Sequence, residues 1–257
     1  MYPDWPESDA DLLPLPRCDG PKLKPFRFDG PQKIKFLDYL GEGSHGHVFK
    51  VEIQGKAYAL KLFRFIYPGD WLHLDHHDHN PIWAMRKPEE SPEYKQMVAA
   101  FVDYSEPFNN ECRAFGRIQE AGREDLATKC FGYLLLSEEN ERLVMEQFGK
   151  HPGISSNLSF AGSIDDPGWE AMRSNYPGKN SGRSPPIRGI VKELAQCNKR
   201  LTTPIAKKLL HSIKELQRLG ITSLDVELRQ VFNDGIFSDL SLAVTVEPYH
   251  ITRRIPS

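Results

Sequence analysis

The chain is predicted to have an α+β fold, in which five antiparallel strands and one helix form a first lobe and a short, mainly helical part follows. Three observations predict this fold. Residues 33–64 contain three short runs of alternating, β-branched or aromatic side chains, as strands do. Residues 107–122 carry apolar side chains at helical spacing. Two further apolar runs, 130–137 and 141–148, resemble strands, so the predicted order is β-β-β-α-β-β.

The N-terminal 32 residues are predicted to be an extended arm. They contain seven prolines, which disfavour the interior of helices and sheets. The first lobe is then expected to cover residues 33–148. Within it, residues 67–106 break the strand pattern with polar and charged side chains, and we interpret them as an insertion.

The opening strands are predicted at 33–41, 47–55 and 56–64. Gln54 and Gly55 make a tight turn between the second and the third strand. In the helix that follows at 107–122, Pro107 suits the first turn, where its missing N–H costs nothing. The last two strands of the lobe are joined by the polar turn SEENE.

The second half begins with residues 149–186, which are rich in Gly, Pro, Ser and Asn and are predicted to be a linker or surface excursion. Residues 187–257 are interpreted as a truncated C-terminal lobe. It contains predicted helices at 187–200 and 203–220, the second capped by Thr203, with Pro204 in its first turn and Gly220 at its end. The strands QVF and IFSD follow, joined by the turn signal Asn-Asp-Gly.

Bulk composition places the chain among ordinary globular proteins. It has 257 residues, 39% of them hydrophobic and 26% charged, and a formal net charge of −2. No basic stripe indicates nucleic-acid binding, and no apolar run indicates a membrane partner. The four cysteines are widely spaced, which favours free thiols in a reducing compartment. We therefore expect an intracellular protein.

The stretch GEGSHGHV contains Gly41, Gly43, Gly46 and Val48 in the pattern GxGxxGxV, between two strands. In that context the backbone N–H groups of a glycine-rich flap can close over phosphates, while Val48 covers an apolar ring. A plain hairpin is the alternative. Fifteen residues after Gly46, Lys61 lies in an otherwise apolar strand, where its ammonium needs a negative partner. Glu111, on the predicted helix, can supply it.

These residues resemble the protein-kinase-like superfamily over about residues 35–245. The resemblance lies in GEGSHGHV, in YALK, in NNECRAF and in the strand end MEQF. More specifically, the chain is similar to the kinase-like fungal kinetochore subunits of the Fta-two type from the Sim-four complex. This similarity implies protein partners, among them kinetochore subunits, and a place in the nucleus at the centromere, with the cytoplasm as the alternative.

The resemblance also assigns roles to single residues. The glycine segment would cover ATP, Lys61 would contact its α and β phosphates, and Glu111 would pair with Lys61. The strand end MEQF, which resembles the hinge of kinases, would place the backbone of Glu146 and Phe148 near the adenine. The residues expected to bind the nucleotide are thus Gly41, Gly43, Gly46, Val48, Ala59, Lys61, Glu111, Glu146 and Phe148.

Downstream, GITSLDVELRQVFNDGIFSDLS aligns with the catalytic and metal-binding motifs of kinases. The alignment makes Asp225 the catalytic aspartate, and Gln230 and Asp239 the magnesium ligands.

Several departures from the kinase pattern oppose phosphoryl transfer. Ser223 and Leu224 replace the usual His-Arg, Glu227 stands where a lysine is usual, and Gln230 replaces an asparagine. Ser241 replaces a glycine. Only sixteen residues follow it, too few for the helices of a lower lobe. We therefore expect a pseudokinase that acts as a binding or scaffold module.

Three alternatives remain open: an active phosphotransferase that uses Asp225 as base, an interaction protein without a nucleotide, and a gene fragment. The histidine-rich segment 73–79 has ligand-type side chains, but we interpret it as a solvated loop rather than a metal site. His45 and His47 are expected to be exposed hairpin residues.

Overall fold

The structure is a computed structural model. It describes residues 23–66, 92, 96, 105–154, 158–160, 173, 176, 185–195, 201–227, 230–232 and 235–245. The histidine-rich segment 73–79 and nearly all of the insertion predicted at 67–106 therefore lie outside the described residues, as do the first 22 residues of the predicted arm.

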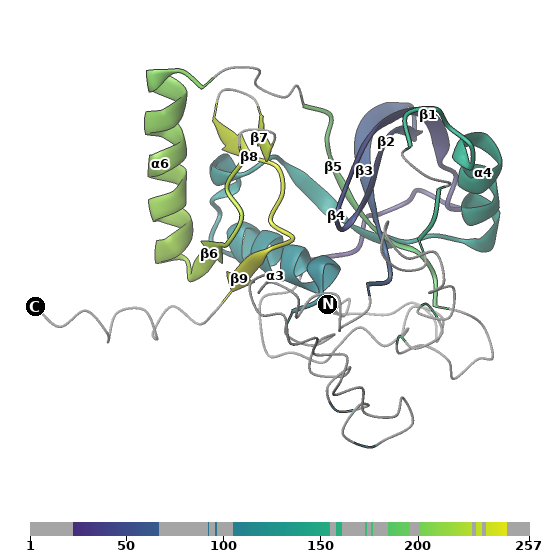
Figure 1. Cartoon of the computed structure of the whole chain (residues 1–257), viewed down its shortest axis with the longest axis horizontal. Coiled ribbons are helices and arrows are strands. Elements are labelled where there is room, and N and C mark those ends of the chain that lie inside the picture. Colours follow the sequence, from purple (N-terminus) through teal and green to yellow (C-terminus); the bar gives the residue numbers. More distant parts are fainter. Residues whose placement is uncertain are drawn as a thin grey trace, which may run out of the picture.

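A five-stranded antiparallel sheet forms the centre of the molecule (Figure 1). The predicted strands at its start are confirmed, and so is the turn between the second and third, where Gln54 and Gly55 have φ angles of 51° and 75°. In spatial order the strands are β1 (Lys35–Gly43), β2 (Gly46–Ile53), β3 (Lys56–Phe63), β5 (Arg188–Glu193) and β4 (Cys130–Leu135).

The helix predicted at 187–200 is wrong, because its first half is strand β5. This strand lies between β3 and β4, and five of its six residues are buried. Burial on both faces removes the alternation of polar and apolar residues that identifies an exposed strand, so the run resembled a helix. The β-branched pair Ile190 and Val191 favours the extended form.

The strand predicted at 141–148 is also wrong. These residues belong to helix α4 (Glu138–Phe148), and the segment interpreted as a polar turn is its first turn. Ser137 is the N-cap and accepts a hydrogen bond from the backbone N–H of Asn140. Acidic side chains in the first turn favour the helix further, through its dipole. A short apolar run does not by itself distinguish a helix from a strand, and here the cap decides.

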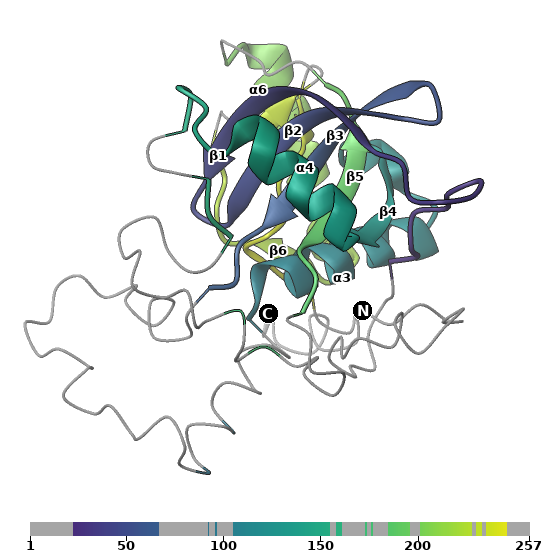
Figure 2. The ribbon, with the colours of Figure 1, turned by 90° about the vertical axis from the view of Figure 1, so that its right-hand side faces the viewer.

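Two helices cover opposite faces of the sheet, and each face has its own core (Figure 2). The predicted helix is confirmed as α3 (Pro107–Glu120), with Pro107 in its first turn. It packs with Phe63 and Ile190 on one face. Helix α4 packs with Phe49 and Leu60 on the other. Odd-numbered residues of β3 therefore point toward α3 and even-numbered residues toward α4.

The C-terminal part packs on the α3 side and contains less helix than predicted. Its helix α6 (Thr203–Arg218) is confirmed, although Thr202 rather than Thr203 is the N-cap; Gly220 follows it with φ 81°. The predicted hairpin is confirmed as β7 (Val231–Phe232) and β8 (Ile236–Phe237), whereas the pairing of β6 (Ile221–Ser223) with β9 (Ala243–Thr245) was not predicted. A short 3-10 helix, η3 (Glu124–Leu126), precedes β4.

The described end of the N-terminal arm lies along the outer edge of β4. Tyr133 exchanges two backbone hydrogen bonds with it: Phe26 N donates to Tyr133 O at 2.7 Å, and Tyr133 N donates to Lys24 O at 3.1 Å. Leu23 is fully buried in the core beside α3. The arm therefore covers a sheet edge that would otherwise expose unpaired backbone groups.

Candidate functional site

The glycine-rich segment forms the tight turn between β1 and β2. Gly43 pairs with Gly46, so Ser44 and His45 are at the tip. A Cβ on Gly46 would lie 2.1 Å from the backbone oxygen of Leu62 on β3. Only glycine permits this close approach of β2 to β3. The requirement for glycine at position 46 thus has a packing cause that needs no ligand.

Three of the residues predicted for the site meet on the α3 side of the sheet. The Nζ atom of Lys61, on β3, lies 2.9 Å from Oε2 of Glu111 on α3 and 2.8 Å from Oδ1 of Asp239, which follows β8. The Lys61 and Glu111 side chains are 6% and 0% exposed, so their charges are removed from water. An ammonium and two carboxylates from three distant parts of the chain therefore form one contact group.

Lys192, on β5, is a fourth member that was missed. Its Nζ lies 2.5 Å from Oε1 of Glu111 and donates a hydrogen bond of 2.6 Å to the backbone oxygen of Ser238. Residue 192 pairs with Ala59 in the sheet, two residues from Lys61, so both lysines project from the same face. The sequence could have indicated Lys192, because this lysine also interrupts an apolar run. It was missed because residues 187–200 were interpreted as a helix, in which a lysine needs no buried partner.

Two lysines and two carboxylates make this four-residue cluster electrically balanced. We call Lys61, Glu111, Lys192 and Asp239 the charge cluster. Burial disfavours the Lys61 ammonium, but the carboxylates of Asp239 and Glu111 outweigh that cost and raise the pKa of Lys61. Burial likewise opposes ionisation of Asp239, yet Lys61 and Lys192 hold its pKa well below the usual range. Lys61 and Asp239 are therefore charged at neutral pH, and the contacts of the four side chains tie β3, β5, α3 and residues 238–239 together.

The predicted catalytic and metal-binding residues make different contacts. The side-chain amide of Gln230 donates to Oδ2 of Asp225 at 2.7 Å, and its oxygen accepts from the backbone N–H of Glu227 at 3.4 Å. Asp239 uses Oδ1 for Lys61 and for the backbone N–H of Ser241. Gln230 and Asp239 thus direct their described side-chain contacts to different partners.

Two predicted nucleotide-binding residues lie away from the charge cluster. Phe148 is buried in the core on the α4 face, where its ring contacts Phe49 at 5.3 Å between centroids. Glu146 is exposed on α4 and pairs with Arg142. Both were predicted next to the adenine because residues 141–148 were interpreted as a strand. The strand that actually adjoins β3 is β5.

Val48 and Ala59 do lie on the face of the charge cluster. In the sheet Val48 pairs with Lys61, and Ala59 pairs with Lys192; paired residues of antiparallel strands project to the same side. Both are partly exposed. Val48, Ala59, Lys61 and Lys192 therefore project from the same face of the sheet.

The prediction that His45 and His47 are exposed is wrong. His45 is partly buried, and its Nδ1 hydrogen-bonds Oγ of Ser241 at 2.8 Å. His47 is 1% exposed: Arg64 donates to its Nε2 at 2.9 Å, and its Nδ1 contacts the hydroxyl of Tyr39 at 3.0 Å. Burial and the Arg64 charge lower the pKa of His47 to about 4, so the ring is neutral at physiological pH.

Among the described residues, no group of three or more His, Cys, Asp or Glu side chains is arranged to hold a metal ion. Nor does any described helix have the length and apolar character needed to cross a bilayer. The described cysteines Cys112 and Cys130 are free and buried. Burial raises the pKa of the Cys130 thiol to about 12, which makes it a poor nucleophile.

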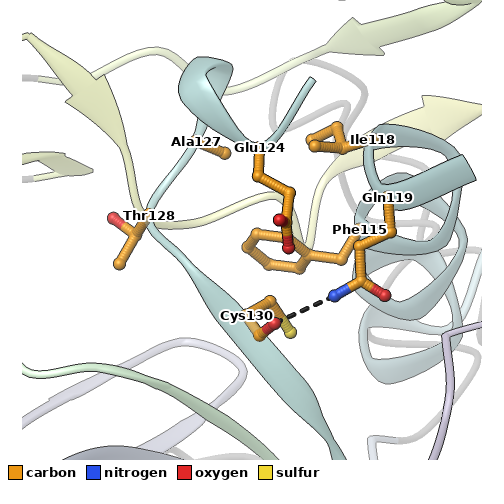
Figure 3. Close-up of a pocket in the computed structure, with 7 residues that line it drawn as sticks. All are labelled: Phe115, Ile118, Gln119, Glu124, Ala127, Thr128 and Cys130. Atoms are coloured by element: carbon orange, nitrogen blue, oxygen red, sulfur yellow. Dashed lines mark hydrogen bonds between the residues drawn. The ribbon is translucent and has the colours of Figure 1, made fainter. Parts of the chain in front are cut away.

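One small pocket lies between α3, η3 and β4, away from the glycine turn (Figure 3). The side chain of Gln119 crosses it and donates to the backbone oxygen of Cys130 at 2.9 Å. Its empty volume of about 160 Å³ includes open solvent. Its enclosed space is about 0 Å³, without room for even a water molecule, whereas ligand pockets usually measure at least about 300 Å³, so this pocket is too small for a nucleotide.

Comparison with protein families gives one match that spans most of the chain. The family described as kinetochore Sim4 complex subunit FTA2 matches residues 12–244. No curated protein is significantly similar to the chain.

Proposed function

Because the chain belongs to the family of the kinetochore Sim4 complex subunit FTA2, we propose that it is a kinetochore-associated scaffold subunit that binds other proteins of that complex. The family match over residues 12–244 carries this proposal. It implies a place in the nucleus, at the centromere.

We further propose that the scaffold is built on a degenerate kinase-like core. Contacts between Lys61, Glu111 and Asp239 support this, because a kinase site needs the same three charge types from the same order of elements. The antiparallel sheet with α3 on one face also supports it. Family membership alone says nothing about the chemistry of this core.

The contacts of the site favour a scaffold over a phosphotransferase. A transferred phosphoryl group needs positive charge around it, whereas the charge cluster is already balanced and Glu227 adds a carboxylate nearby in the sequence. Magnesium ligation by Gln230 and Asp239 stays a prediction, and we derive no metal-dependent step.

A direct test is reconstitution of the chain with the other subunits of the Sim4 complex. We expect the wild-type chain to co-elute with them in size-exclusion chromatography. Asp225→Asn should co-elute equally well, because the scaffold needs no catalysis. A chain that elutes alone in every combination would refute the proposal. Phosphoryl transfer from radiolabelled ATP that is lost in Asp225→Asn would favour the enzyme instead.

ATP binding is the second candidate function, and one observation favours it: Lys61 and Glu111 meet as a nucleotide site would require. Thermal unfolding tests it. ATP at a hundred times its dissociation constant should stabilise the folded chain by about 2.7 kcal/mol, and Lys61→Met should abolish the shift. ATP and ATP with magnesium should be measured separately, because magnesium ligation by Gln230 and Asp239 is itself a prediction. Equal unfolding temperatures with and without nucleotide would remove this candidate.

A further inference from the structure

Arg64, which directly follows β3 and is 3% exposed, forms hydrogen bonds with the turn at residues 43–46. The Arg64 guanidinium donates to the backbone oxygen of Gly43 at 2.7 Å and to the carboxylate of Glu42 at 3.0 Å. Its backbone N–H donates to the backbone oxygen of His45 at 3.0 Å. One arginine therefore fixes successive groups of the turn against the sheet, and its charge is neutralised by Glu42.

From the other side, the turn is tied to the C-terminal segment. His45, at the tip of the turn, hydrogen-bonds the hydroxyl of Ser241 at 2.8 Å, across 196 residues of sequence. Ser241 is 2% exposed. Its backbone N–H donates to Asp239 at 3.0 Å, and its backbone oxygen accepts from Asn110 on α3 at 3.5 Å. Ser241 thus connects the turn, the charge cluster and α3.

These contacts form a continuous chain from the sheet to the turn: Lys61 binds Asp239, Asp239 accepts from Ser241, and Ser241 binds His45. The ammonium of Lys61 and the side chain at the tip of the turn are thereby both engaged within the protein. The ammonium of Lys61 already has two carboxylates, and the tip of the turn is fastened to residue 241. A phosphate-bearing ligand would have to separate His45 from Ser241 and compete with Asp239 for Lys61.

We propose that the His45–Ser241 hydrogen bond is a latch that holds the glycine turn closed and excludes phosphate-bearing ligands from the charge cluster. The ligand class in this proposal rests on the second candidate function, nucleotide binding, whereas the latch contacts themselves do not depend on it. His45 and Ser241 are then the residues that decide whether ATP can enter. A serine rather than a glycine at position 241 is essential, because the latch needs its hydroxyl.

Hydrogen exchange measured by mass spectrometry on the full chain tests the latch. We expect Ser241→Ala and His45→Ala to speed amide exchange in residues 42–47 at least fivefold, because the turn loses its contact with residue 241. Ser44→Ala, in the same turn but exposed, is the matched control and should leave the rates unchanged. His45→Gln keeps a side chain that can hydrogen-bond the hydroxyl, so it should exchange like the wild type.

The ligand part is tested by calorimetric titration with ATP in the absence of metal. The double variant His45→Ala/Ser241→Ala should bind ATP at least tenfold more tightly than the wild type. Unchanged exchange in the turn of both single variants, or equal ATP affinities for the wild type and the double variant, would overturn the proposal. Neither result depends on binding to other kinetochore proteins. A failed reconstitution with the Sim4 complex would therefore not contradict the latch, and a failed latch experiment would not contradict the scaffold function.

Discussion

Replacing Lys192 with methionine tests whether the charge cluster stabilises the fold. Methionine keeps most of the length of the side chain and removes the ammonium. Glu111, which is fully buried, would then keep only Lys61, and the cluster would carry one uncompensated negative charge. The backbone oxygen of Ser238 would also lose its donor.

The expected cost is large because a buried charge is left without its partner. Removing one member of a buried ion pair costs about 3–5 kcal/mol, and Lys192 has an 8% exposed side chain against a Glu111 that is 0% exposed. For a chain of this length, that loss corresponds to a fall in the melting temperature of about 10 °C. Urea unfolding followed by circular dichroism measures the free energy directly.

Two further variants make this prediction specific. In Lys192→Met/Glu111→Gln, Lys61 and Asp239 remain as a balanced pair, so the double variant should be more stable than the sum of the two single losses by about 1–3 kcal/mol. Lys56→Met, at an exposed position at the start of β3, should change stability by no more than about 0.5 kcal/mol. A loss below about 1 kcal/mol for Lys192→Met, or strict additivity in the double variant, would refute the reasoning.

Three other substitutions test neighbouring features by urea unfolding. The pKa of His47 is lowered from 6.5 to about 4, so as the pH falls the unfolded chain binds the proton before the folded chain does. The free energy of unfolding should therefore fall by up to about 3 kcal/mol between pH 6.5 and pH 4. His47→Gln should make the free energy of unfolding less dependent on pH over this range, and an unchanged pH dependence would contradict this prediction. Gly46→Ala should cost about 2–3 kcal/mol because its Cβ would strike a β3 backbone oxygen, whereas Gly43→Ala, with open space around it, is the control. Glu106→Gln leaves the buried Arg188 without its carboxylate and should cost about 3–5 kcal/mol; a loss under 1 kcal/mol would argue against that ion pair.

The elements predicted correctly are those whose signals are local. Strand β2 alternates buried and partly exposed residues along most of its length, and the Gln54-Gly55 turn between β2 and β3 requires positive φ angles that these residues tolerate. Helices α3 and α6 carry a proline in the first turn, and both have strongly one-sided apolar patterns. Each of these signals acts within a few residues, so no tertiary contact is needed to recognise it.

The two misassigned elements, β5 and α4, failed for different reasons. Strand β5 is buried on both faces because β3, β4 and the two cores surround it, and its sequence therefore lacks a strand period. For α4, the decisive residue was the N-cap Ser137, whose role depends on the local backbone rather than on hydrophobic spacing. Both errors moved the predicted adenine contact to Glu146 and Phe148, away from the face of the charge cluster.

The sequence alone determined that Lys61 needs a carboxylate and that Glu111 lies on a helix able to provide one, because a lysine in an apolar strand is costly without a partner. Only the tertiary structure decided that Lys192 shares Glu111, that Asp239 completes the balance, and that His45 reaches Ser241. These pairings join residues 81 to 196 positions apart. Charge balance and hydrogen bonding within a buried cluster depend on which side chains the fold brings together, and no local pattern records that.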